Sequence, residues 1–282
     1  MKKKIVVVSF LLLVVILMTY VVVRINTLKY DTKSGDKSNS IPTLYLHGWG
    51  AGARSSNSLI SYAEKHNNAK KVLVAKVLKS GQVIFSGSWP NNVKRPIIQI
   101  VMADNKNSDY QLTEKWYANI LKKLKDDYHI KKYNTVSHSM GNLTTMYYQM
   151  SHKSSDLPSL NRQVNIAGHF DGILGIDDTP NKNSLVPNGE PKIKNHYYSF
   201  LNQHRNEYPD GSVKVLNIFG NLNNGTNSDG SVSVVSAKSL KWLLRGKYKS
   251  YQEYEVFGDK GQHSKLHEND RVSQVIGNFL WP

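Results

Sequence analysis

The chain has 282 residues, of which 39% are hydrophobic, enough for one large packed domain and too many for an intrinsically disordered protein. It contains no cysteine, which excludes disulfide bonds, thiolate metal sites and cysteine nucleophiles. Lysine and arginine outnumber aspartate and glutamate by 37 to 21, which gives a formal net charge of +16. The basic residues are scattered and form no nucleic-acid recognition motif. We therefore expect a surface suited to anionic cell-wall polymers and no nucleic-acid partner.

The N-terminus has the pattern of a membrane anchor. Three lysines at positions 2–4 precede residues 5–23, which carry no charge. As a helix at about 1.5 Å per residue this run would measure roughly 28 Å, close to the ~30 Å hydrocarbon core of a bilayer. No A-x-A-like cleavage site follows it. We expect residues 1–24 to form a single-pass signal anchor with the rest of the chain outside the cell. Cleavage, giving a secreted protein, is the alternative.

A polar stretch without periodicity, residues 25–40, predicts a flexible linker to a globular domain at 41–282. In this domain short β-rich runs alternate with helical stretches, which is typical of an α/β fold with a mainly parallel sheet covered on both faces. We predict strands at 43–46, 71–77, 82–86, 96–102, 133–136, 163–167, 213–219 and 251–257, and helices at 56–68, 113–128, 141–152, 194–205 and 271–280. Residues 169–210, rich in Asn, Pro, Gly and Asp, predict a long insertion that we interpret as a substrate-covering lid.

A candidate nucleophile lies between a predicted strand and a predicted helix. Residues 137–141 read Ser-His-Ser-Met-Gly and differ from the G-x-S-x-G elbow at one position, Ser137. The elbow needs small residues because its serine lies on a strained turn, and Ser137 adds only a hydroxymethyl group. We therefore predict Ser139 as the nucleophile. A structural serine at a tight turn is the alternative.

Three segments together carry a family resemblance. The strand end at 47–50 (His-Gly-Trp-Gly), the elbow at 138–141 and the C-terminal segment 262–269 (Gln-His-Ser-Lys-Leu-His-Glu-Asn) resemble a poorly characterised family of α/β-hydrolases on Gram-positive cell surfaces. They are also similar to small bacterial lipases and esterases. The resemblance covers roughly residues 40–282 and implies an α/β-hydrolase fold and a serine mechanism. We expect a carboxyl esterase or lipase-like enzyme that acts on a small-molecule or lipid ester without a cofactor.

A serine hydroxyl needs a histidine base and a carboxylate, which follow in the order Ser, acid, His in this fold. The loop at 221–230, after the penultimate core strand, contains one carboxylate, Asp229. Asp177 and Asp178 in the predicted lid are alternatives. His263 and His267 both come after the last strand. We favour His263, because the base lies on a loop several residues before the closing helix in related hydrolases, and His267 remains the alternative.

The oxyanion of the tetrahedral intermediate needs backbone donors. We expect them to be the N–H groups of Met140, which follows the nucleophile, and of Trp49, in the loop after the first strand, with His47 a structural residue of that loop. His263 and His267, four positions apart and followed by Glu268, could bind zinc from one helix face, but they lack the H-E-x-x-H order and no third ligand is evident. The Asn- and Asp-rich residues 221–230 could bind calcium, but they lack the EF-hand spacing. We expect no metal.

Two other functions remain open on the same scaffold. An acyltransferase or amidase would share the acyl-enzyme chemistry. A catalytically inactive surface-binding protein would keep the fold without the reaction, because a fold alone does not determine a function.

Overall fold

The computed structural model describes residues 36–151 and 156–282. The predicted anchor at residues 1–24 and most of the predicted linker therefore lie outside the described residues. Among the helices that are described, none is both long enough and apolar enough to cross a bilayer. The end of the predicted linker already packs on the domain, because the backbone N–H of Lys37 donates to the carbonyl of Tyr128 and the Lys37 side chain is buried.

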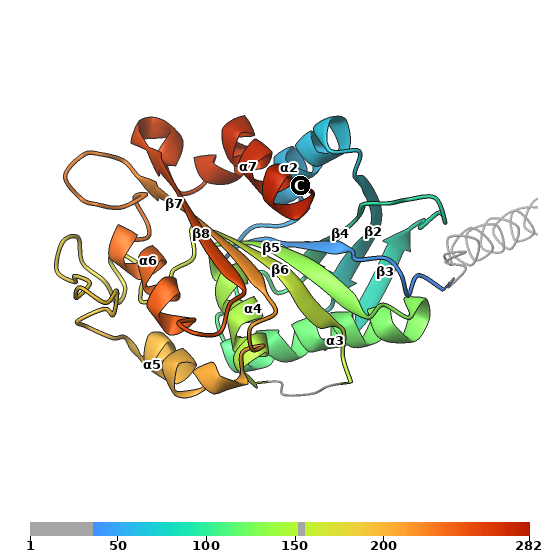
Figure 1. Cartoon of the computed structure of the whole chain (residues 1–282), viewed down its shortest axis with the longest axis horizontal. Helices are drawn as coiled ribbons and strands as arrows, with labels where there is room; N and C mark the ends of the chain where they lie inside the picture. The colour runs from blue at the N-terminus through green and yellow to red at the C-terminus, as the bar shows by residue number, and fades with distance from the viewer. Residues whose placement is uncertain (1–35, 152–155) are drawn as a thin grey trace, which may run out of the picture.

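Within the described residues the strands form one eight-stranded sheet in the order β3-β2-β4-β1-β5-β6-β7-β8 (Figure 1). All neighbouring strands pair in parallel except β2 and β3, which are antiparallel. The strands are β1 (Thr43–Leu46), β2 (Lys70–Val77), β3 (Val83–Gly87), β4 (Pro96–Met102), β5 (Lys132–His138), β6 (Ser159–Ile166), β7 (Lys214–Asn221) and β8 (Ser250–Phe257). Each predicted strand is present, and residues 96–102 coincide with β4.

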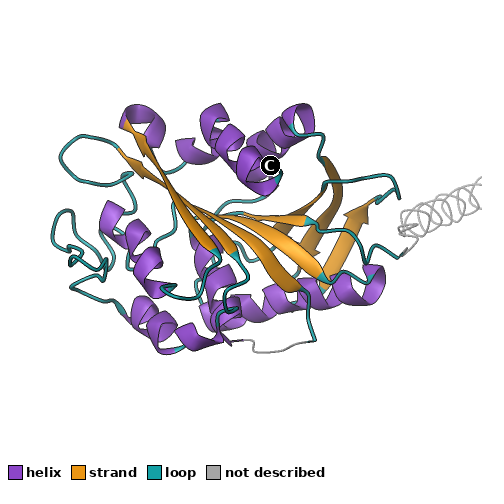
Figure 2. Ribbon diagram, viewed as in Figure 1, coloured by secondary structure: helices purple, strands orange, loops and turns teal. Residues whose placement is uncertain are grey.

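Helices cover both faces of this sheet, as predicted (Figure 2). The face with α2 and α7 packs around one apolar cluster, and the face with α3, α4, α5 and α6 packs around another. The helices are α2 (Ala53–His66), α3 (Tyr110–Tyr128), α4 (Met140–Ser151), α5 (His196–Gln203), α6 (Val234–Leu243) and α7 (Asp270–Leu280).

Central strand β1 shows how the sequence builds both clusters. Leu44 and Leu46 belong to the cluster under α3 and α4, whereas Tyr45 belongs to the cluster under α2 and α7. Successive side chains of a strand point to opposite faces, so a strand covered on both sides is apolar throughout. This explains the uninterrupted apolar run that predicted the strand.

Helix α6 was not predicted from the sequence. The hydroxyl of Ser233 accepts a hydrogen bond from the N–H of Ser236 at 3.1 Å and caps its first turn. Helix α5 begins in the same way at Asn195, whose side chain accepts from the N–H of Tyr198 at 2.7 Å. Side chains of this kind satisfy N–H groups that have no partner within the helix. The predicted lid at 169–210 contains α5 and the short 3-10 helix Arg205–Glu207.

The parallel strands bring their following loops to one edge of the sheet. The segments after β1, β5, β6, β7 and β8 all lie there, because parallel strands share the direction of their carboxyl ends. In Figure 1 the loops after β6 and β7 lie at the left, in yellow and orange, and the described chain begins at the right, in blue. The candidate site and the start of the domain are therefore at opposite edges.

Candidate active site

Ser139 lies on a strained turn between β5 and α4. Its φ angle is 51°, in the left-handed region that residues other than glycine rarely adopt. Its N–H donates to the carbonyl of Ile166, at the end of neighbouring β6, at 2.9 Å. A Cβ atom added at Gly141 would lie 2.8 Å from the carbonyl oxygen of His47. Glycine is thus required at position 141, in the first turn of α4, by the close approach of the loop after β1.

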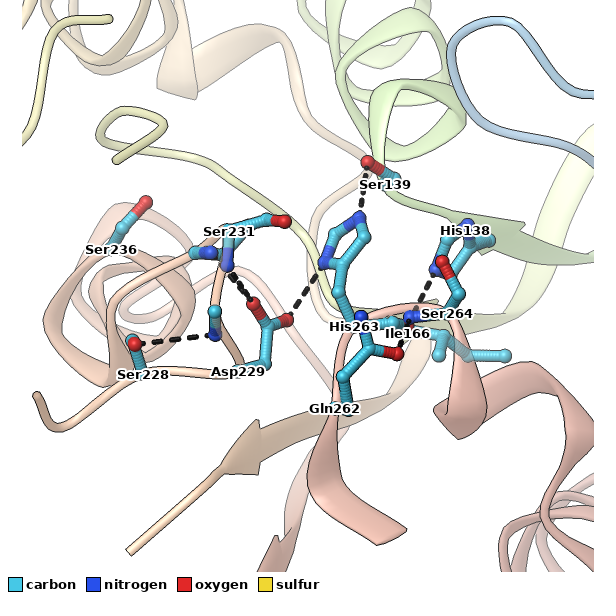
Figure 3. A network of polar contacts seen from close by, with 12 residues as sticks. His138, Ser139, Ile166, Ser228, Asp229, Ser231, Ser236, Gln262, His263 and Ser264 are labelled. Carbon is cyan, nitrogen blue, oxygen red and sulfur yellow. Dashed lines mark hydrogen bonds and ion pairs between the residues drawn. The ribbon is translucent and has the colours of Figure 1, made fainter. Parts of the chain in front are cut away.

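Three of the predicted residues meet in a continuous line of hydrogen bonds (Figure 3). Nε2 of His263 is 2.9 Å from Oγ of Ser139, and Nδ1 of His263 is 2.8 Å from Oδ2 of Asp229. Because an ionised carboxylate only accepts, Nδ1–H donates to Asp229, and Nε2 is left to accept the proton of the Ser139 hydroxyl. This is the arrangement in which a serine can be deprotonated.

Asp229 is held from its own loop. It is 1% exposed, and its second carboxylate oxygen accepts from the N–H groups of Ser231 and Val232 at 2.8 and 2.7 Å. Its main-chain carbonyl accepts from the N–H of His263 at 2.9 Å. The acid loop and the histidine loop are therefore joined through both side chain and main chain.

The segments that precede these two loops approach closely at a pair of glycines. A Cβ atom at Gly220, in β7, would lie 1.7 Å from the carbonyl oxygen of Gly261, in the 3-10 helix Gly258–Gly261. Only glycine leaves room for this contact. It brings the segment that carries His263 onto the end of the strand that precedes Asp229.

The loop after β1 lies against Ser139. A Cβ atom at Gly48 would be 2.9 Å from Cβ of Ser139. Met140 is the first residue of α4, so its N–H has no carbonyl partner within the helix. The Trp49 side chain is 59% exposed and donates through Nε1 to the carbonyl of Lys106 at 2.9 Å. The two segments predicted to supply oxyanion donors therefore touch at Ser139.

His47 connects two strand ends. Its Nε2 accepts from the N–H of Met102 at 3.1 Å, and its Nδ1–H donates to the carbonyl of Gly48 at 2.8 Å. Both ring nitrogens are thus used by the main chain, and burial lowers the pKa of this imidazole. The geometry agrees with the structural role expected for His47.

The alternative base and acids lie elsewhere. His267 is buried and packs edge-on against the ring of His138, with 4.7 Å between the ring centroids. His263, by contrast, contacts Ser139. Asp177 accepts from the N–H of Ile173, and Asp178 accepts from the hydroxyl of Ser233 at 2.6 Å. These aspartates hold the segment after β6 in place and are not hydrogen-bonded to His263.

Three buried ionisable residues near the site were not given a role by the sequence: His138, His169 and Asp171. Burial lowers the pKa of His169 to about 4 and raises that of Asp171 to about 7. Both follow β6, the neighbour of β5, so their position at the carboxyl edge was predictable. Their burial was not, because a single histidine or aspartate in a polar insertion has no distinguishing pattern.

The zinc alternative does not fit the geometry. Both ring nitrogens of His263 are engaged, one by Ser139 and one by Asp229. Within residues 36–151 and 156–282, no group of three or more His, Asp or Glu side chains has an arrangement that could hold a metal ion.

A mainly parallel sheet with a serine on the turn after a central strand, in line with an aspartate and a histidine from later loops, defines the α/β-hydrolase class. The chain belongs to the family described as alpha/beta hydrolases of unknown function (DUF915), which matches residues 31–282.

Two solved structures have the same fold. The product of the gene lin2722 of Listeria innocua is 23% identical, with a TM-score of 0.75, over 86% of this chain and 94% of the other. A protein of Lactobacillus plantarum WCFS1, described as a candidate cell surface hydrolase, is 24% identical, with a TM-score of 0.70, over 86% and 91%. No curated protein matches the chain.

Proposed function

We propose that this protein is an extracytoplasmic serine hydrolase that cleaves carboxyl esters through an acyl-enzyme intermediate. The observation that carries the proposal is the line from Ser139 through His263 to Asp229, with distances of 2.9 and 2.8 Å. A serine becomes a nucleophile when a neighbouring base takes its proton, and the base works when a third group holds its tautomer.

In the first half-reaction, Oγ of Ser139 bonds to the ester carbonyl carbon while its proton passes to Nε2 of His263. The carbonyl oxygen becomes an oxyanion, and the N–H groups of Met140 and Trp49 stabilise it. The C–O bond to the alcohol then breaks, and the alcohol leaves with the proton from His263. Asp229 stays ionised and stabilises the imidazolium.

In the second half-reaction, a water molecule repeats these steps on the acyl-enzyme. His263 takes a proton from the water, whose oxygen attacks the acyl carbon. The ester bond to Ser139 breaks, Oγ recovers its proton, and the carboxylic acid is released. If an alcohol or amine replaced the water, the same residues would perform acyl transfer.

The topology also supports a proposal for where the site acts. The described chain begins at the sheet edge opposite Ser139, so an anchor at residues 1–24 would attach to the far side of the domain. We propose that the site points away from the membrane, into the cell envelope, where a net charge of +16 favours anionic cell-wall polymers. The description of the Lactobacillus plantarum structure as a candidate cell surface hydrolase supports the same location.

Labelling with a fluorophosphonate probe tests the reaction class, since a serine activated by a neighbouring base attacks the phosphorus and displaces fluoride. We expect the full-length protein, purified in detergent, to be labelled at Ser139 and to hydrolyse p-nitrophenyl esters of graded chain length. A folded wild-type protein that neither reacts with the probe nor hydrolyses any of these esters would contradict the proposal and favour an inactive binding protein.

A further inference from the structure

His138, the residue before the nucleophile, connects the Ser139 turn to the loop of His263. Nε2 of His138 lies 3.1 Å from the main-chain carbonyl oxygen of His263 (Figure 3). A carbonyl oxygen can only accept, so Nε2 carries the proton and donates it. The hydrogen bond therefore links the main chain of one reacting residue to the immediate neighbour of the other.

The ring of His138 lies in a closely packed site. It is 9% exposed, and its centroid is 4.9 Å from that of His263 and 4.7 Å from that of His267. A Cβ atom at Gly48 would lie 3.1 Å from its Nδ1, so the glycine leaves room for the imidazole. The ring has little freedom to leave the carbonyl that it contacts.

A neutral His138 suits this place. Burial, followed by the two neighbouring histidines, holds the pKa of His138 well below the ordinary histidine value. A positive charge here would oppose the imidazolium that forms on His263 during the reaction. The neutral tautomer with its proton on Nε2 supplies a donor without that charge.

We propose that His138 is a positioning residue that sets the distance between Nε2 of His263 and Oγ of Ser139; this inference rests on the proposed hydrolase function. The Asp229 carboxylate already fixes the His263 imidazole through Nδ1. The main-chain carbonyl of Asp229 also accepts a hydrogen bond from the main-chain N–H of His263. The carbonyl side of His263 is held by His138. Because His138 and Ser139 are consecutive, movement of the nucleophile turn relative to the histidine loop requires this hydrogen bond to break.

The test compares His138→Phe, which keeps a ring but removes the donor, with His138→Gln, whose amide nitrogen can occupy the position of Nε2. The measurements are the rate constant of fluorophosphonate labelling, the fraction labelled at completion, and kcat and KM for p-nitrophenyl acetate. We expect His138→Phe to lower the labelling rate and kcat by about 10- to 100-fold, since a misplacement of about 1 Å can cost about 100-fold. KM should change little and labelling should still go to completion. His138→Gln should stay within a few-fold of wild type.

A merely structural role would give a different result: a smaller labelled fraction at the wild-type rate, with the phenylalanine and glutamine variants equally affected. That result, or wild-type kinetics in His138→Phe, would overturn the inference. If His138→Phe does not fold, His138→Asn, whose amide is too short to reach the carbonyl, takes its place beside His138→Gln. An unreactive wild-type protein would instead refute the proposed function itself.

Discussion

Nε2 of His263 lies 2.9 Å from Oγ of Ser139, although 124 positions separate the two residues in the chain. Ser139 follows β5 and His263 follows β8, and β6 and β7 lie between these strands in the sheet. The contact is made beyond the carboxyl ends of the strands, by the loops that follow them. It therefore depends on the twist and register of four strands, and it exists only in the folded protein.

Replacing Ser139 with alanine should abolish fluorophosphonate labelling and lower kcat by at least about a thousandfold, because the nucleophile is lost. The stability should change by no more than about 1 kcal/mol, the typical net contribution of one hydrogen bond. Ser137→Ala is the matched control. Its buried hydroxyl lies 3.2 Å from that of Thr135, so that variant should still be labelled. Wild-type turnover in Ser139→Ala would show that another residue performs the reaction.

The two C-terminal histidines should differ sharply in kinetics. His263→Ala should lower kcat by several orders of magnitude, and Asp229→Asn somewhat less, because the base remains but is poorly oriented. His267→Ala should keep most of its activity, since His267 packs against His138 and not against Ser139. Steady-state kinetics of the three variants check this order. An inactive His267→Ala enzyme beside an active His263→Ala enzyme would reverse the assignment.

A single methyl group at Gly48 should impair catalysis. The added Cβ atom would lie 2.9 Å from Cβ of Ser139, so either the nucleophile or the loop before Trp49 must shift. We expect kcat/KM to fall about tenfold or more, because small displacements of reacting groups are costly. Gly52→Ala is the control, since nothing lies within 4 Å of its Cβ position. Equal kinetics in the two variants would argue against tight packing of this loop on Ser139.

The stability of the domain should depend on pH through Asp171. Burial raises its pKa from 3.8 to about 7, so between these values the folded protein holds a proton that the unfolded chain has released. The stability linked to this group is complete below about pH 4 and is lost as the pH rises through about 7. Asp171→Asn, which cannot ionise, should become more stable relative to wild type by on the order of 2–4 kcal/mol between pH 5 and pH 8.

Thermal unfolding of wild type and Asp171→Asn at several pH values measures this change. The nearby carboxylates of Asp177 and Asp178 are present in both proteins, so their contribution largely cancels in the comparison. A difference between the two melting temperatures that stays constant with pH would mean that the Asp171 carboxyl titrates in the ordinary range.

Membrane attachment should follow from residues 5–23, which carry no charge and come directly after three lysines. The full-length protein should sediment with membranes and resist extraction with salt, since hydrophobic insertion is not screened by ions. External protease should release a fragment that begins within residues 25–42. Full recovery of the intact protein from the soluble cytoplasmic fraction would rule out the anchor.

The sequence alone predicted the strands, most helices and the turn that carries Ser139, because these depend on local patterns. Apolar runs buried on both faces predicted central strands such as β1 and β4, and a small-residue turn between β5 and α4 predicted the position of Ser139. Helix α6 was missed because it follows the polar loop at 221–233, where a short capped helix has few distinguishing residues. Caps and short apolar faces are weak signals beside a continuous buried strand.

The sequence favoured His263 over His267 only through its distance from the closing helix, and the tertiary structure shows that His263 is the one that contacts Ser139. The choice depends on where the segment with the two histidines crosses β7, at the close contact of Gly261 with Gly220, and on the main-chain hydrogen bond from His263 to Asp229. The tertiary structure also decided the burial of His169 and Asp171, and with it the pKa values of about 4 and about 7. Contacts between distant segments and the loss of water around a charge arise only when the chain is packed, so no local pattern records them.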